Sequence, residues 1–178
     1  SPISRESGLI LNNLLLVVST IVVFIGTIWP LVAELILGRK LSVGAPFFEI
    51  AFTPFMVVLA IFLPLGAILP WKRAQILRAG SPLIGALSLS VAIGLLIWSL
   101  QTGGRILAPI GLALSAWVIL GSLTDLLMRC RMIDIGFSAG LRRLINLTRA
   151  DWGKTFAHIG LGLTIFGISA ITAWETED

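Results

Sequence analysis

Five long apolar stretches divide the chain, and shorter polar segments separate them. The stretches cover residues 8–28, 47–69, 82–100, 107–128 and 155–174. A helix needs about 20 apolar residues to cross a hydrocarbon core of about 30 Å. Apolar residues run continuously through the stretches, whereas the strands of a membrane barrel would alternate apolar and polar positions. The pattern predicts an all-α, polytopic integral membrane protein, one block with about five transmembrane helices plus interfacial segments.

Two connecting segments are longer than turns. Residues 31–37 are apolar with one acid, so they either extend the first helix or lie along the outer interface. Residues 129–154 form a basic loop in which Arg142, Arg143 and Arg149 lie among leucines and an isoleucine. This spacing predicts a basic amphipathic helix on the surface of an anionic leaflet.

The composition supports a membrane protein, and this affects how its net charge is interpreted. The 178 residues are 57% hydrophobic and 12% charged, with a mean hydropathy of +1.01, whereas soluble domains carry roughly 25% charged residues. The net charge is +4. In a membrane protein such a balance reports orientation, so no nucleic-acid partner is expected. The one cysteine, Cys130, excludes a disulfide within the chain.

The distribution of basic residues predicts the orientation. With residue 1 in the cytoplasm, ten of the 13 lysines and arginines lie on the inner side, including those of residues 129–154. Cytoplasmic loops carry the excess of Lys and Arg in membrane proteins. We therefore expect a cytoplasmic N-terminus, a C-terminus on the outer side, periplasmic in a Gram-negative cell, and the basic loop in the cytoplasm.

The most informative polar residue is the single histidine, His158, which lies inside the last apolar stretch. An ionisable side chain at this depth faces a partner or a cavity, and neutral imidazole is a common ligand of metals, haem iron included. Gly160 and Gly162 would leave room for a flat, bulky group beside the helix. Position alone also fits a hydrogen bond to a neighbouring helix, snorkelling to the interface, or a proton relay.

Other residues suggest structural roles. Asp125 and Arg129 are four residues apart on one helical face, which predicts a local ion pair. Trp117 lies in the middle of a stretch and is assigned to packing. Pro54 and Pro64 can kink the second stretch without marking a site. We find no phosphate loop, zinc spacing or pair of nucleophile and base, and therefore no complete catalytic site.

Several short motifs follow one another in a familiar order. They are Ser-Arg-Glu-Ser-Gly at 4–8, Leu-Asn-Asn-Leu-Leu-Leu-Val at 11–17, Gly-Thr-Ile-Trp-Pro at 26–30, Leu-Ser-Val-Gly-Ala-Pro-Phe-Phe at 41–48, Phe-Thr-Pro-Phe-Met at 52–56, Ala-His-Ile-Gly at 157–160 and Trp-Glu-Thr-Glu at 174–177. Together they resemble a membrane block of the cytochrome c haem lyases of the CcmF/NrfE type. The resemblance covers essentially the whole chain and implies a mid-to-C-terminal fragment of a larger protein.

The resemblance implies a function in the bacterial inner membrane. Such proteins accept haem from a haem chaperone and attach it covalently to apocytochrome c, whose cysteines are kept reduced by thiol-reducing partners. They also hold a haem b between two transmembrane histidines, and His158 matches the second of these. The Trp-rich outer segment, the outer histidines and the first transmembrane histidine have no counterpart here, so the remainder of the lyase must supply them.

Two alternative functions remain besides that of a haem lyase. In one, the chain is part of a proton-coupled transporter in which His158 relays protons and the proline-kinked second stretch lines a path. In the other, the chain is a purely structural assembly subunit.

Overall fold

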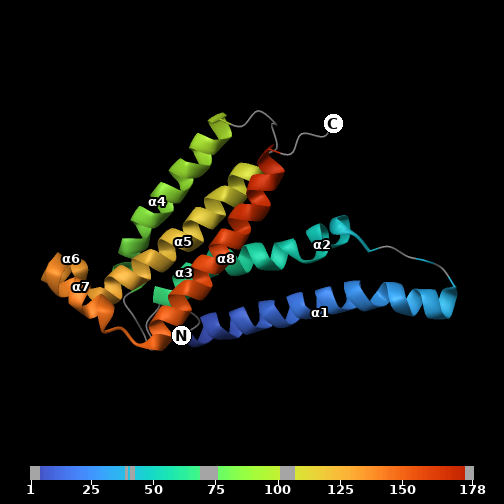
Figure 1. Cartoon of the computed structure of the whole chain (residues 1–178), viewed down its shortest axis with the longest axis horizontal. Helices are drawn as coiled ribbons and strands as arrows, with labels where there is room; N and C mark the ends of the chain where they lie inside the picture. Colours follow the sequence, from blue (N-terminus) through green and yellow to red (C-terminus); the bar gives the residue numbers. More distant parts are fainter. Residues whose placement is uncertain (1–4, 39, 41–42, 69–75, 101–106, 175–178) are drawn as a thin grey trace.

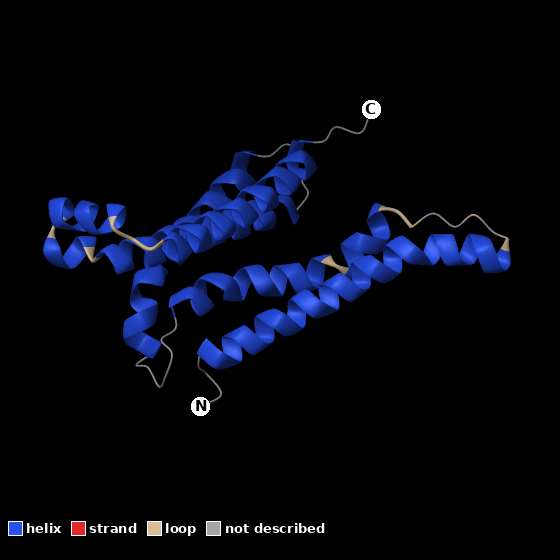
Figure 2. Ribbon diagram, turned by 60° about the horizontal axis from the view of Figure 1, so that its bottom comes forward, coloured by secondary structure: helices blue, strands red, loops and turns tan. Residues whose placement is uncertain are grey.

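The computed structural model describes residues 5–38, 40, 43–68, 76–100 and 107–174. Within these residues the structure is helical and contains no strand (Figure 2). The ends of three quoted motifs, at residues 4, 41–42 and 175–177, lie outside the described residues.

Eight described helices follow one another along the chain. They are α1 (Arg5–Leu37), α2 (Ala45–Ala51), α3 (Thr53–Ile68), α4 (Ile76–Leu100), α5 (Leu107–Cys130), α6 (Met132–Ile135), α7 (Phe137–Ile145) and α8 (Arg149–Trp174). Of these, α1, α4, α5 and α8 are long and apolar enough to cross a membrane, and α3 is a shorter apolar helix. The predicted all-α, polytopic membrane fold is confirmed.

The helices form two groups that meet at α3 (Figure 1). Helix α5 packs between α4 and α8, and these three lie side by side. Helix α1 packs along α3, which in turn contacts α5. Helices α6 and α7 form a compact hairpin at the end of α5. Helix α8 packs against α5, and residues near its start share a cavity with residues of α1 and α3.

Two helix boundaries differ from those expected from hydropathy. Helix α1 continues to Leu37, so residues 31–37 extend the first helix rather than lying separately along the interface. The second apolar stretch is divided at Phe52 into α2 and α3. Pro54 lacks the N–H that would bond to the carbonyl of Ile50, which explains why the helix is interrupted there.

The core between the two groups is built around Trp117. Trp117 and Val118 of α5 pack with Ala60 of α3 in a buried cluster. The indole Nε1 of Trp117 donates a hydrogen bond to the carbonyl oxygen of Ile61 at 3.0 Å. Because a buried indole N–H needs an acceptor, this bond fixes α3 against α5. The packing role assigned to Trp117 is confirmed.

Small residues allow α5 and α8 to approach closely. A Cβ on Gly162 would lie 2.5 Å from Cγ1 of Ile119, and one on Gly111 would meet the side chain of Ser169. The Ser115 hydroxyl donates to the carbonyl oxygen of Gly162 at 2.8 Å. Close backbones and hydroxyl bonds are typical of helix contacts inside membranes, where apolar burial gives little drive for association.

The two glycines of α8 give a matched test of this interface. Gly162→Val should lower the free energy of unfolding by about 1–3 kcal/mol more than Gly160→Val, because only the first side chain would enter the contact with Ile119. Both variants make the same change in helix propensity, and a Cβ on Gly160 has no neighbour within 4 Å among the described residues. Thermal unfolding in detergent would measure the difference, and equal losses would contradict the packing described here.

Candidate functional site

His158 lies where α8 passes the α1–α3 pair. Its side chain is partly buried and lines a cavity of about 220 Å³ between the three helices. The cavity is lined by Gly8, Leu9, Leu11, Asn12, Leu15, Leu59, Phe62, Leu63, Leu65, Gly66, Ala67, Lys154 and His158. Sequence reasoning singled out His158, but the walls supplied by α1 and α3 come from residues about 90 to 150 positions away.

The cavity is mostly apolar, with few polar side chains. Asn12, Lys154 and His158 supply the polar groups, and aliphatic and aromatic side chains supply most of the remainder. Within the described residues, the imidazole of His158 has no hydrogen-bond partner. A neutral imidazole beside apolar space keeps a nitrogen lone pair available as a ligand.

The surroundings of the two glycines correct part of the sequence interpretation. Gly162 does not leave space for a bulky group, because Ile119 of α5 fills the position that its side chain would occupy. Gly160 is exposed and has open space around it. Any cofactor held by His158 must therefore approach from the side of α1 and α3, because Ile119 blocks the path across Gly162 and Gly160 lies on another face of the helix.

Lys154, one helical turn before His158 on α8, belongs to a network of four charged side chains. Asp125 of α5 is 5% exposed and accepts from Nε of Arg129 at 3.1 Å and from Nζ of Lys154. Nη1 of Arg129 in turn donates to Oδ1 of Asp151 at 2.7 Å. The predicted pair between Asp125 and Arg129 is confirmed, and it belongs to a larger network that joins α5 to α8.

The start of α8 is fixed by the same network. The Thr148 hydroxyl accepts from the backbone N–H of Asp151 at 3.2 Å and donates to Oδ2 of Asp151 at 2.6 Å. A threonine followed three residues later by an acid is a helix-capping pattern. The helix therefore begins at Arg149, and Lys154 lies on it rather than in a loop. Lys154 contacts Asp125 and also lines the cavity, about 6 Å along the helix from His158.

The donor set limits what the cavity can bind. Among the described residues, no three His, Cys, Asp or Glu side chains come together as a metal site. One imidazole can supply one axial position to a metal whose other ligands come from a macrocycle, as in haem. The cavity of about 220 Å³ is smaller than the roughly 300–1,000 Å³ of usual ligand pockets. These residues therefore fit the edge of such a group and not the whole of it.

The chain is similar over its whole length to known proteins. It is 50% identical over 178 residues to the cytochrome c-type biogenesis protein ccl1 of Rhodobacter capsulatus, covering 100% of this chain and 26% of that protein. It is 42% identical to CycK of Rhizobium meliloti, with 99% and 26% covered, and 32% identical to CcmF of Escherichia coli, with 98% and 25% covered. Both are also named as cytochrome c-type biogenesis proteins.

These relatives are much longer than the chain. The chain spans about a quarter of the length of the curated relatives it matches. No family model matches the chain, and no solved structure matches it.

The ion network can be tested with two aspartates. Asp125→Asn should lower the free energy of unfolding by about 2 kcal/mol, because it leaves Arg129 and Lys154 without their shared carboxylate. Fully buried pairs lose about 3–5 kcal/mol, and the partial exposure of both cations reduces the effect. Asp134→Asn removes the carboxylate of an exposed pair with Arg131 and should change stability by less than about 0.5 kcal/mol. If chemical denaturation shows equal losses of stability in the two variants, the network contributes no more to stability than an exposed ion pair does.

Proposed function

We propose a role in cytochrome c maturation for this chain, which belongs to the cytochrome c-type biogenesis proteins of the CcmF and NrfE type. Its relatives carry that name, and its described helices fit a multi-pass membrane protein. The finer proposal is that the chain is one membrane block of a haem lyase in the bacterial inner membrane. Its partners would be the remainder of the lyase, a haem chaperone, apocytochrome c and the thiol-reducing proteins that serve it.

Within that role, His158 is proposed as an axial ligand of a transmembrane haem b. This proposal rests on the imidazole of His158, which has no hydrogen-bond partner among the described residues. The imidazole belongs to a membrane-length helix and lines a mainly apolar cavity. Such a haem would supply one-electron redox chemistry, with a potential set by its axial ligands and by burial. One ligand is present in this chain, so the second would come from the remainder of the protein.

The other cavity residues have supporting roles in this proposal. Aliphatic side chains of α1 and α3 exclude water from the imidazole. Lys154 places a positive charge at one end of the cavity, where it would favour anionic substituents of a bound group. Its contact with Asp125 holds it there and limits the rotation of α8. With the N-terminus in the cytoplasm, this charged end would face the cytoplasm, and ligation of the apocytochrome would take place outside.

An optical spectrum tests the ligand role directly. The protein that carries this chain should purify with a reduced b-type spectrum, and His158→Ala should lower its haem content at least several-fold, since it removes an axial ligand. Asn12→Ala changes another polar residue of the same cavity and should leave the spectrum largely intact.

Two results would contradict parts of this proposal. A full, unshifted spectrum in His158→Ala would place the ligand elsewhere while leaving the family assignment in place. A wild-type protein without haem, from cells with abundant haem, would exclude the haem b and favour proton transfer through His158.

Complementation tests the broader role. In cells that lack the corresponding biogenesis protein, wild-type protein should restore covalent haem in c-type cytochromes, measured by haem staining after denaturing electrophoresis. His158→Ala should reduce this yield about tenfold or more, as loss of a metal ligand or its supporting group commonly does. If wild type fails to restore cytochrome c while it is inserted in the membrane at a normal level, the maturation role is wrong.

A further inference from the structure

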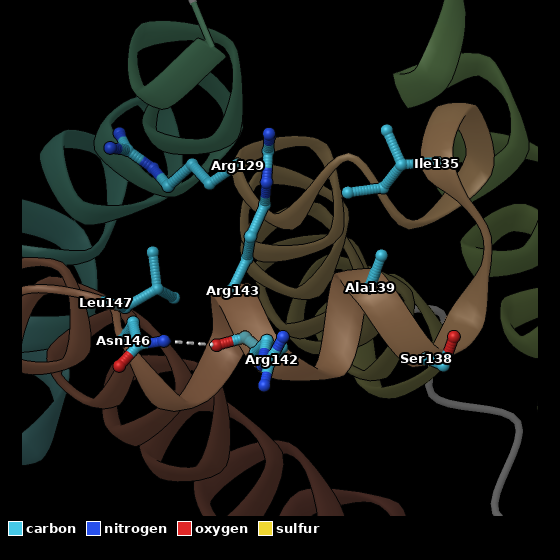
Figure 3. A pocket seen from close by; sticks show the side chains of 8 residues that line it. All are labelled: Arg129, Ile135, Ser138, Ala139, Arg142, Arg143, Asn146 and Leu147. Carbon is cyan, nitrogen blue, oxygen red and sulfur yellow. Dashed lines mark hydrogen bonds between the residues drawn. The ribbon is translucent and has the colours of Figure 1, made fainter.

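A second hollow lies at the α6–α7 hairpin and includes Arg129 of the ion network in its wall. It is an open groove of about 910 Å³ formed by α5, α6, α7 and the residues that follow α7 (Figure 3). It is lined by Arg129, Ile135, Ser138, Ala139, Arg142, Arg143, Asn146 and Leu147. Three of these eight residues are arginines, so the groove is strongly basic.

Two glycines shape the hairpin that forms this groove. Gly136 joins α6 to α7 at a φ of 86°, a conformation that side-chain-bearing residues rarely adopt. Gly140 is buried against Met132, whose Cγ would lie 2.5 Å from a Cβ at that position. The turn and the close contact hold α7 beside the end of α5, so the groove is part of the fold.

The arginines of the groove differ in their partners. Arg129 is already neutralised by Asp125 and Asp151. Arg142 and Arg143 are exposed, and neither forms an ion pair with a described residue. In Figure 3 the side chain of Arg143 extends from α7 toward the level of Arg129, while Arg142 lies near Asn146. The groove therefore contains two guanidinium groups whose charge nothing in the described structure balances.

The opposite face of α7 is apolar and exposed. Phe137, Leu141 and Ile145 are 74%, 42% and 75% exposed, and their spacing of four residues places them along one side of the helix. A short helix with an apolar face and a basic face lies in the boundary between headgroups and acyl chains. Because a membrane-length helix ends near the lipid headgroups, the position of α7 at the end of α5 would place the groove near the level of lipid phosphates.

We propose that this groove binds the phosphate of an anionic membrane phospholipid. Arg142 and Arg143 supply the charge, because the planar guanidinium pairs with phosphate oxygens through two parallel hydrogen bonds. Ser138 adds a hydroxyl donor, and Ile135, Ala139 and Leu147 provide apolar contact for the glycerol and upper acyl carbons. A lipid is favoured over a soluble phosphate because the apolar face of α7 fixes the helix at the membrane surface.

Lipid retention by the purified protein tests this site. The protein that carries this chain would be placed in phosphatidylcholine nanodiscs with increasing phosphatidylglycerol, and bound lipids would be counted by native mass spectrometry. We expect one tightly held phosphatidylglycerol, and at least about tenfold weaker retention in Arg142→Gln/Arg143→Gln, because this double variant removes the charge-assisted hydrogen bonds to the bound phosphate. The double variant Arg131→Gln/Arg149→Gln removes two other exposed charges at the same end, outside the groove, and should change retention less than threefold.

Each alternative outcome would overturn the proposal. Equal loss in the two double variants would show diffuse attraction instead of a site. Displacement of the lipid by millimolar inorganic phosphate would identify a soluble anion as the ligand. Equal retention of phosphatidylcholine and phosphatidylglycerol by the wild type would exclude recognition of the anionic headgroup, and this measurement needs no variant.

Discussion

The structure depends on the buried carboxylate of Asp125. A charge at 5% exposure inside a membrane-length helix is expensive unless cations neutralise it. Arg129, one turn further along α5, supplies one cation, and Lys154 of α8 supplies the other. Because the second cation comes from another helix, the need to neutralise Asp125 fixes α8 against α5 both in rotation and along its axis.

This constraint connects the two hollows at the same end of the molecule. Lys154 contacts Asp125 and lines the cavity that contains His158. Arg129 contacts Asp125 and Asp151 and lines the basic groove. Each hollow therefore shares one wall residue with the network. A change in the charge of either wall residue would alter the ion pairs of Asp125, so the two hollows are linked through the network.

The sequence predicted those features that are encoded locally. Hydropathy identified the helical membrane fold, and i,i+4 spacing identified the pair of Asp125 and Arg129. The contact of Lys154 with Asp125 was not predicted, because a contact across 29 positions leaves no periodic signal in the sequence. The space expected at Gly162 was wrong for the same reason: only the packing of α5 shows that Ile119 fills it. Length and hydropathy likewise predict that residues 47–69 form a single span. In the structure, the missing N–H of Pro54 divides this span at Phe52.

The placement of His158 fits a ligand that must meet a partner on another helix. An axial site formed by two helices requires each side chain to be held within about 0.5 Å, and such precision comes from rigid elements more readily than from loops. The capped start of α8, the ion network one turn away and the Ser115–Gly162 bond one turn beyond hold His158 from both sides. A histidine that snorkelled to the interface would need none of this support. These contacts on both sides of His158 therefore support a positioned imidazole, whichever group it meets.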